Sequence, residues 1–230
     1  MKKPYLSVVM PVFNEKDTIQ EIIKKVSQVD IDKEIIIVDD ASTDGARQIL
    51  QGLKQDGVKV FFHERNLGKG KALKTGFKEA SADIIIIQAA DLEYDPKEYL
   101  RLIEPIAQGH ADVVYGSRLS GGMPQRVYMF WHKVGNNFLT FLTNILYNTT
   151  LSDMETGYKV FKKEVIANID IKSRDFTVEA EITAKIFKQK YRVYEMPISY
   201  YGRNYSEGKK IRWYHGISAI IALIRYKFTD

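Results

Sequence analysis

The 230-residue sequence contains no cysteine. This absence excludes a disulfide-stabilised scaffold, an iron–sulfur cluster, a thiolate zinc site and a cysteine nucleophile, and it is typical of a reducing compartment. Long apolar runs are also missing. The longest lie at 35–38, 84–87 and 219–224, whereas a membrane-spanning helix needs about 20 apolar residues. The first ten residues carry no signal-peptide pattern. We therefore expect a cytoplasmic protein, located at the cytoplasmic face of a membrane for the reasons given below.

The charge balance is only mildly basic. Lys and Arg total 34 and Asp and Glu total 29, for a formal net charge of +5. This excess is compatible with phosphorylated ligands or an anionic membrane surface, and it does not indicate nucleic acid as a partner. Hydrophobic residues make up 45% and charged residues 27%, as in ordinary soluble globular proteins. The length fits one domain, which we place at residues 1–230.

The first half of the sequence alternates between short β-rich runs and helical patterns. The predicted strands are 6–12, 34–38, 58–62, 83–87 and 112–115, and the predicted helices are 16–28, 43–54, 69–80 and 96–108. Continuous apolar strands that alternate with helices are typical of a mostly parallel sheet covered on both faces. The second half predicts two more strands, 158–161 and 191–198, and a helix at 178–188. The fold class is therefore α/β.

Acidic residues follow the predicted strands, at the sheet edge where ligands bind in such folds. Asp91 and Glu93 come just after the fourth strand and could hold a divalent cation, Mg²⁺ or Mn²⁺. A helix-capping loop before Pro96 explains them equally well. Asp39 and Asp40 follow the second strand, where an N-cap cluster is the alternative to a ligand site. The residues alone leave these interpretations open.

A short glycine pattern lies between Asn66 and Lys71. Gly68 and Gly70 could allow the backbone to approach a phosphate closely. The same residues also make a good turn and helix start. The pattern alone therefore does not distinguish a phosphate site from a turn.

Two segments of the second half combine aromatic, aliphatic and basic residues. They are 123–147 and 208–228, and neither reaches spanning length. Amphipathic helices of this kind can lie in a membrane interface, with apolar faces in the acyl boundary and Lys or Arg near the headgroups. Burial against the sheet or in a dimer interface is the alternative. We expect interfacial helices here, and peripheral contact with a membrane.

The chain resembles the family 2 glycosyltransferases of the GT-A fold, a Rossmann-like α/β fold, over essentially its whole length. It is most similar to the polyprenol-phosphate sugar synthases, the group of dolichol-phosphate mannose synthases. The motifs that carry this resemblance, in order, are Pro11-Val12-Phe13-Asn14-Glu15, Val38-Asp39-Asp40-Ala41-Ser42-Thr43-Asp44-Gly45, Asn66-Leu67-Gly68-Lys69-Gly70, Asp91-Leu92-Glu93-Tyr94-Asp95-Pro96, Gly116-Ser117-Arg118, Asp153-Met154-Glu155-Thr156-Gly157-Tyr158-Lys159 and the segment 203–210.

The resemblance implies roles for individual residues. The residues that would bind the nucleotide-sugar are Pro11, Phe13, Glu15, Asp39, Asp40, Gln88 and Asp91. Asp91 and Glu93 would bind the metal. The catalytic residues would be Asp91, Arg118, Arg203 and Lys209. The residues that would bind the acceptor phosphate are Arg118, Arg126, His132, Arg203, Lys209 and Lys210. The alternative is that these basic side chains form a solvated surface without a ligand. Residues 1–118 would form the nucleotide-sugar half, and 119–230 the half that faces acceptor and membrane.

One position departs from the family pattern. The family normally carries Asp-x-Asp after the fourth strand, whereas this chain reads Ala89-Ala90-Asp91. Natural divergence would leave Asp91 and Glu93 to hold the ion, and an engineered replacement would trap a donor or impair turnover. We expect the missing carboxylate at Ala89 to weaken metal binding.

The resemblance implies inverting transfer of a hexose from a nucleotide-sugar, of the GDP-mannose or UDP-glucose type, to a polyprenyl or dolichyl phosphate, with a divalent metal. One alternative is transfer to a sugar hydroxyl in polysaccharide or glycolipid assembly, for which Glu179 or Glu181 could be the base. Another is a non-catalytic nucleotide-sugar-binding module. A dinucleotide dehydrogenase is disfavoured because no Gly-x-Gly-x-x-Gly follows the first strand.

Overall fold

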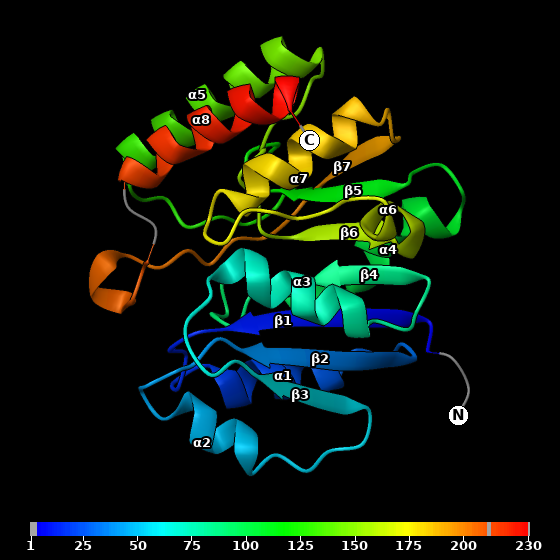
Figure 1. The fold of residues 1–230 in the computed structure, drawn as a ribbon, viewed down its shortest axis with the longest axis vertical. Helices are drawn as coiled ribbons and strands as arrows, with labels where there is room; N and C mark the ends of the chain where they lie inside the picture. The colour runs from blue at the N-terminus through cyan, green and yellow to red at the C-terminus, as the bar shows by residue number, and fades with distance from the viewer. Residues whose placement is uncertain (1–3, 211–212, 230) are drawn as a thin grey trace.

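The computed structural model describes residues 4–210 and 213–229 as an α/β sandwich built on one seven-stranded sheet. The strand order is β3-β2-β1-β4-β6-β5-β7 (Figure 1). The strands are β1 (Leu6–Val12), β2 (Lys33–Asp39), β3 (Val58–Phe62), β4 (Ile84–Ile87), β5 (Val113–Ser117), β6 (Lys159–Lys162) and β7 (Val193–Pro197). Every pairing is parallel except the two that β6 makes with β4 and β5. The predicted mostly parallel sheet is therefore confirmed.

Helices cover both faces of the sheet, because its central strands are apolar on both sides. The core on one face includes residues of α1 (Ile19–Ser27), α2 (Ala46–Gln51) and α4 (Tyr99–Ala107), the last continuing the short 3-10 turn Pro96–Glu98. The core on the other face includes residues of α3 (Lys69–Glu79), α5 (Phe130–Tyr147), α6 (Lys163–Ala167), α7 (Val178–Lys188) and α8 (Trp213–Phe228). A second 3-10 turn spans Tyr205–Glu207.

The predicted elements agree with the structure to within a few residues at most ends. The strands 6–12 and 58–62 and the helix 178–188 have the predicted bounds. The short helix α6 was not predicted, because its five residues span little more than one turn. Part of the predicted helical tail 208–228, residues 211–212, lies outside the described residues, and α8 begins directly after them. The domain predicted at 1–230 also includes residues 1–3 and 230, which lie outside the described chain.

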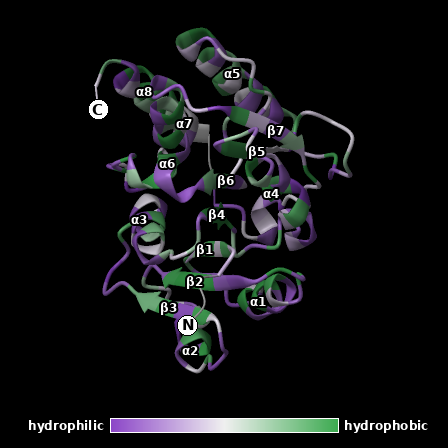
Figure 2. Ribbon diagram, turned by 90° about the vertical axis from the view of Figure 1, so that its right-hand side faces the viewer, coloured by the Kyte–Doolittle hydropathy of each residue, from purple (hydrophilic) through white to green (hydrophobic). Residues whose placement is uncertain are grey.

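Helices α5 and α8 pack against each other at the end of the molecule opposite α2 and β3 (Figure 1). Both bury a narrow apolar stripe, which includes Leu139 on α5 and Leu223 on α8. Figure 2 shows hydrophobic residues on both helices as well as along the strands. Among the helices of the described residues, none is long and apolar enough to cross a membrane.

Candidate functional site

A cavity of about 520 Å³ lies at the carboxyl ends of the central strands. Its lining includes Phe13 after β1, Asp40 after β2, Asp91 after β4 and Arg118 after β5. Parallel strands bring their carboxyl ends to one edge of the sheet, so residues about 100 positions apart meet there. The predicted gathering of polar groups at this edge is thereby confirmed.

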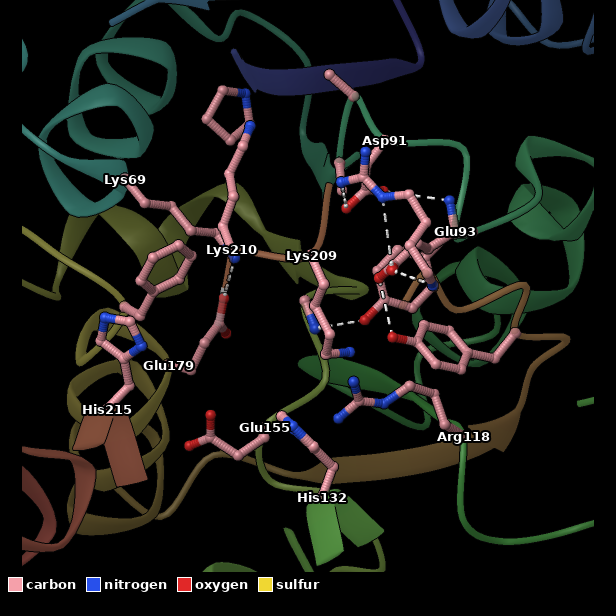
Figure 3. Close-up of a pocket in the computed structure, with 18 of the residues that line it drawn as sticks. Lys69, Asp91, Glu93, Arg118, His132, Glu155, Glu179, Lys209, Lys210 and His215 are labelled. Atoms are coloured by element: carbon pink, nitrogen blue, oxygen red, sulfur yellow. Dashed lines mark hydrogen bonds and ion pairs between the residues drawn. The ribbon is translucent and has the colours of Figure 1, made fainter. Parts of the chain in front are cut away.

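Three carboxylates lie around the Arg203 guanidinium on one wall of the cavity, and Figure 3 labels two of them, Asp91 and Glu93. Its Nη1 and Nη2 donate to the two oxygens of Glu15 at 3.0 and 3.2 Å, and Nη2 lies 3.4 Å from Asp91 Oδ2. Glu93 Oε1 accepts from the Arg203 backbone amide at 2.7 Å, and Glu93 Oε2 accepts from Tyr200 at 2.9 Å. The structure thus brings together Glu15, Asp91, Glu93 and Arg203, all of which the sequence predicted.

The carboxylates of Asp91 and Glu93 fit a divalent cation. Burial and the adjacent Glu93 raise the pKa of Asp91 above its usual range, although Arg203 opposes this effect. Crowded negative charge of this kind is relieved by a cation, and hard oxygen donors suit Mg²⁺ or Mn²⁺. Within residues 4–210 and 213–229, no group of three or more such side chains could hold a metal ion by itself. The two carboxylates would therefore share the ion with phosphate oxygens and water, as is common for Mg²⁺.

Arg118 is buried and paired with Asp153, which the sequence did not assign to the site. Its Nε and Nη2 donate to the two oxygens of Asp153, each at 2.7 Å, and its backbone amide donates at 3.0 Å. The ring of Tyr200 lies 5.2 Å from the guanidinium carbon. This clamp fixes Arg118 in the cavity wall and leaves Nη1 without a protein partner in the described chain.

The predicted nucleoside-binding residues divide into two groups. Pro11, Phe13 and Asp40 line the cavity. Asp39 does not line it: its carboxylate is fully buried and accepts from Arg47 Nη1 at 3.0 Å. Asp39 and Asp40 differ because successive side chains along a strand point to opposite faces, and Asp39 is the last residue of β2.

Gln88 also lies outside the cavity lining. Its side chain is fully buried, where it accepts a hydrogen bond from Tyr99 at 2.8 Å and donates to the carbonyl of Ala89 at 3.0 Å. Asp40, although it lines the cavity, is also occupied, because its oxygens bond His63 Nδ1 and the amides of Leu67 and Gly68. Asp40 therefore holds the loop 66–68 in place.

Four further residues predicted to bind the acceptor phosphate also lie along the cavity. Lys210 donates to Glu15 at 2.6 Å, and Lys209 lies 3.4 Å from the hydroxyl of Tyr128. Arg126 is paired with Glu207 at 2.5 Å. The ring of His132 contacts the hydroxyl of Tyr205 at 2.8 Å, and burial together with Lys209 lowers the pKa of His132. All four residues line the cavity, so the structure brings this predicted group together.

The two carboxylates considered as a base are both engaged. Glu179 lines the cavity, but it is paired with Lys69 at 2.7 Å and with Lys159. Burial would raise its pKa, but Lys159 and Lys69 outweigh burial and lower the pKa to about 2. Glu181 is absent from the cavity lining and is paired with Lys185 at 2.7 Å. Neither carboxylate is free to accept a proton from an acceptor hydroxyl.

The glycines of the 66–70 loop make room for protein backbone. Gly68 has a φ of +91°, and a Cβ built there would lie 2.1 Å from the carbonyl oxygen of Arg174. A Cβ on Gly70 would lie 2.1 Å from the carbonyl oxygen of Ser173. Of the two interpretations of this loop, the structure therefore supports the turn and helix start, closely packed on residues 173–174.

Sequence reasoning missed part of the cavity wall. Glu155, Lys69, Phe176 and His215 line the cavity but were assigned no role. Glu155 and Lys69 lie within two of the motifs that carried the family resemblance, so the sequence could have indicated that they lie near the site. Phe176 and His215, whose rings lie 5.1 Å apart, come from segments that carried no motif.

Comparison with known proteins agrees with this geometry. Residues 7–170 match the family described as Glycosyl transferase family 2. An uncharacterized protein of Methanocaldococcus jannaschii is 30% identical over 232 residues, which cover 99% of this chain and 94% of the relative. The dolichol-phosphate mannosyltransferase of Pyrococcus furiosus is 29% identical over 89% of this chain, and the low-salt glycan biosynthesis hexosyltransferase Agl6 of Haloferax volcanii is 30% identical over 87%. The matches span only 58% and 48% of those two relatives.

Solved structures share the fold. Glucosyl-3-phosphoglycerate synthase from Mycobacterium tuberculosis, crystallised with Mn²⁺, uridine diphosphate and phosphoglyceric acid, aligns with a TM-score of 0.74. The alignment covers 99% of this chain and 80% of that one at 20% sequence identity. At this identity the likeness establishes the fold, which is the GT-A arrangement predicted from the sequence.

Proposed function

The chain belongs to glycosyl transferase family 2, and we propose that this glycosyltransferase moves a hexose from a nucleotide-sugar to a polyprenyl phosphate, with a divalent cation and with inversion at the sugar carbon. The dolichol-phosphate mannosyltransferase among its relatives supports a lipid-phosphate acceptor. The uridine diphosphate and Mn²⁺ bound by a structural neighbour support the donor class and the ion.

The observation that carries the proposal is the double role of helix α5. His132, Lys133 and Asn136 of this helix line the cavity. The same helix exposes Trp131 and Phe138 to 78% and 54% of their surface. A helix that is basic toward an anion-binding cavity and apolar toward the outside suits an acceptor with a phosphate head and a hydrocarbon tail.

The cation would be held by Asp91 and Glu93. When bound, it would neutralise the diphosphate of the donor and so stabilise the leaving group. Arg203 stands beside both carboxylates and can contact the same phosphates. Its position would keep positive charge at this wall while the diphosphate departs.

The acceptor phosphate needs positive charge more than it needs a base. A phosphate monoester carries a charge of about −1.5 to −2 at pH 7, so its oxygen is already a competent nucleophile. Lys209, Lys210 and the free Nη1 of Arg118 could orient it against the sugar carbon. This requirement agrees with the engagement of Glu179 and Glu181 in ion pairs, which leaves neither available as a base.

A transfer assay tests the proposal. The purified chain is incubated with radiolabelled UDP-glucose or GDP-mannose, a prenyl phosphate and Mn²⁺ or Mg²⁺, and labelled lipid is extracted and counted. We expect transfer from one of the donors, loss of transfer in EDTA, and a fall of about 100-fold in D91N, because electrostatic stabilisation of the leaving group is lost.

The matched control is D56N, which removes an exposed carboxylate near the opposite edge of the sheet. It should retain full transfer. Label that appears in a glycoside of a sugar hydroxyl, with none in prenyl phosphate, would refute the proposed acceptor and favour the polysaccharide or glycolipid alternative.

A further inference from the structure

Glu155 is a carboxylate in the cavity wall that the proposed mechanism does not use. It lies in the loop that leads into β6, and Figure 3 shows its side chain in the cavity on the same side as Glu179. Its Oε1 is shielded from solvent and has no hydrogen-bond partner in the described chain. A buried polar oxygen without a partner is costly, so such an atom in a ligand cavity points to a missing donor.

Within residues 4–210 and 213–229, no basic side chain donates to Glu155 Oε1. The ammonium groups of Lys69 and Lys159 are both directed to Glu179. The Arg118 guanidinium donates through Nε and Nη2 to Asp153. A bound ligand can therefore supply the donor that Glu155 Oε1 lacks among the described residues.

The charges around Glu155 identify what kind of donor fits. Lys69, Lys159 and Arg118 are three cations, and Glu179, Asp153 and Glu155 are three carboxylates. The charges balance when Glu155 is ionised and leave one excess positive charge when it is protonated, so in either state a metal ion or an ammonium group would add an uncompensated positive charge. Burial and then the Glu179 carboxylate raise the pKa of Glu155 to about 7, although Lys159 and Arg118 oppose this effect. A neutral donor, such as a hydroxyl, is what such a carboxyl accommodates best.

Glu155 is also distinct from the carboxylates proposed for the cation. Besides burial, the charged groups with the largest effect on the pKa of Glu155 are Glu179, Lys159, Arg118 and Asp153. Those with the largest effect on the pKa of Asp91 are Glu93, Arg203 and Glu15. The cavity thus has two acidic regions, one beside Arg203 and one beside the ion pairs of Glu179.

We propose that Glu155 determines sugar specificity by accepting a hydrogen bond from a hydroxyl group of the donor's hexose. This inference rests on the nucleotide-sugar donor of the proposed function and is independent of the acceptor. The region beside Arg203 would hold the diphosphate, and the region beside Glu179 would hold the sugar. Recognition of this kind discriminates strongly, because a sugar that lacks the hydroxyl leaves the carboxylate unpaired.

Calorimetric titration tests the assignment. Wild type, E155Q and E155A are titrated with UDP, UDP-glucose, GDP and GDP-mannose in the presence of Mn²⁺. The informative quantity is the ratio of the Kd of the nucleoside diphosphate to the Kd of the matching nucleotide-sugar, which isolates the contribution of the hexose. For the donor that wild type prefers, we expect E155A to lower this ratio about tenfold or more, because a hydrogen bond to a buried carboxyl group is lost.

Binding of the nucleoside diphosphate itself should not change in E155Q or E155A. E104Q is the matched control, since Glu104 is an exposed carboxylate on α4 outside the cavity lining. Thermal unfolding of each variant confirms that it is folded. A further titration with a UDP-hexose epimer should show that E155Q discriminates less between epimers than wild type does.

The possible outcomes separate this inference from the proposed function. An unchanged ratio in both Glu155 variants overturns the sugar contact and leaves the proposed transferase intact. An unchanged ratio with a loss of turnover would make Glu155 a base for an acceptor hydroxyl, which overturns the inference as stated. A lowered ratio in an enzyme that ignores prenyl phosphate would uphold the sugar contact and refute the proposed acceptor. Absence of nucleotide-sugar binding by wild type would refute both.

Discussion

At the scale of single residues, Arg203 governs the electrostatics of the acidic wall. One guanidinium faces Glu15, Asp91 and Glu93, and its Nε is buried without a hydrogen-bond partner in the described chain. Truncation of Arg203 would leave three carboxylates close together, and like charges at this distance repel strongly. In the proposed cation site the arginine would be a positive neighbour, and its charge would affect how tightly Asp91 and Glu93 hold an ion.

Ala89 stands at the position where the family pattern carries an aspartate. It is partly buried and lines the cavity two residues before Asp91. We predict that A89D binds Mn²⁺ about tenfold more tightly and transfers hexose faster, because an added carboxylate raises the charge and the ligand count near the ion. Calorimetric titration with Mn²⁺ and the transfer assay measure the two effects.

A89N is the matched control for A89D, since it adds the same volume without the charge. It should resemble the present chain in both assays. If A89D neither tightens Mn²⁺ binding nor raises transfer, the carboxylate at this position has no part in the cation site.

At the scale of elements, helices α5 and α8 pack on each other and both expose apolar side chains. Phe130, Trp131 and Phe138 on α5 are more than half exposed, as are Ile217 and Ile221 on α8. The two helices pack on each other and on α7, so their positions relative to each other are fixed. Exposed apolar patches rimmed by polar residues mark membrane or protein contacts.

We predict that the exposed apolar side chains of α5 and α8 bind anionic membranes. The present chain should sediment with phosphatidylglycerol vesicles, and the double variant W131S/F138S should bind about tenfold less, because two large apolar side chains no longer enter the acyl boundary. Lipid-acceptor transfer should fall in parallel, while binding of nucleotide-sugar stays unchanged.

L100S is the control for the vesicle experiment, since Leu100 is 52% exposed but lies on α4, on the opposite face of the sheet. It should sediment with vesicles as the present chain does. Vesicle binding that is absent, or equal in W131S/F138S, would assign the exposed apolar side chains of α5 and α8 to a protein partner or a second copy instead.

At the scale of the whole molecule, the sequence predicted the layers better than the strand order. Continuous runs such as Ile84–Ile87 identify buried strands, because a strand covered on both faces has no polar side. The place of β6 between β4 and β5 could not be predicted from the sequence. It depends on the path of the long segment between β5 and β6, which brings β6 back to the sheet. The same limit applies to the cavity. Glu155 became notable only when the partners of its neighbours Lys159 and Arg118 were known.

Glu34 ties together three segments at the amino edge of the sheet. It accepts hydrogen bonds from Ser7 at 2.6 Å and from the amide and hydroxyl of Ser81 at 2.6 and 2.8 Å, and it pairs with Lys59 at 2.8 Å. Burial would raise its pKa, but Lys59 and the two serines outweigh burial and lower the pKa to about 2. Glu34 therefore stabilises the folded molecule in its charged form.

We predict that E34Q lowers the free energy of unfolding at pH 7 by about 1–3 kcal/mol. A lowered carboxyl pKa stabilises the fold fully above the unfolded value, near 4.5, and this contribution is lost as pH falls toward 2. Urea unfolding at several pH values should thus show a gap between wild type and E34Q that narrows below about pH 4.5. E104Q should show no gap, and a gap independent of pH would assign the effect to packing alone.

The position of β6 has a consequence for the order in which the chain is assembled. Strand β5 ends at residue 117, yet both of its neighbours in the sheet, β6 and β7, begin only at residues 159 and 193. During synthesis from the amino terminus, β1 to β4 can pair as soon as they emerge, whereas β5 must wait with unpaired edges. Distant pairings of this kind slow folding and expose edges to aggregation. The middle of this chain is therefore the stretch for which a chaperone would matter most.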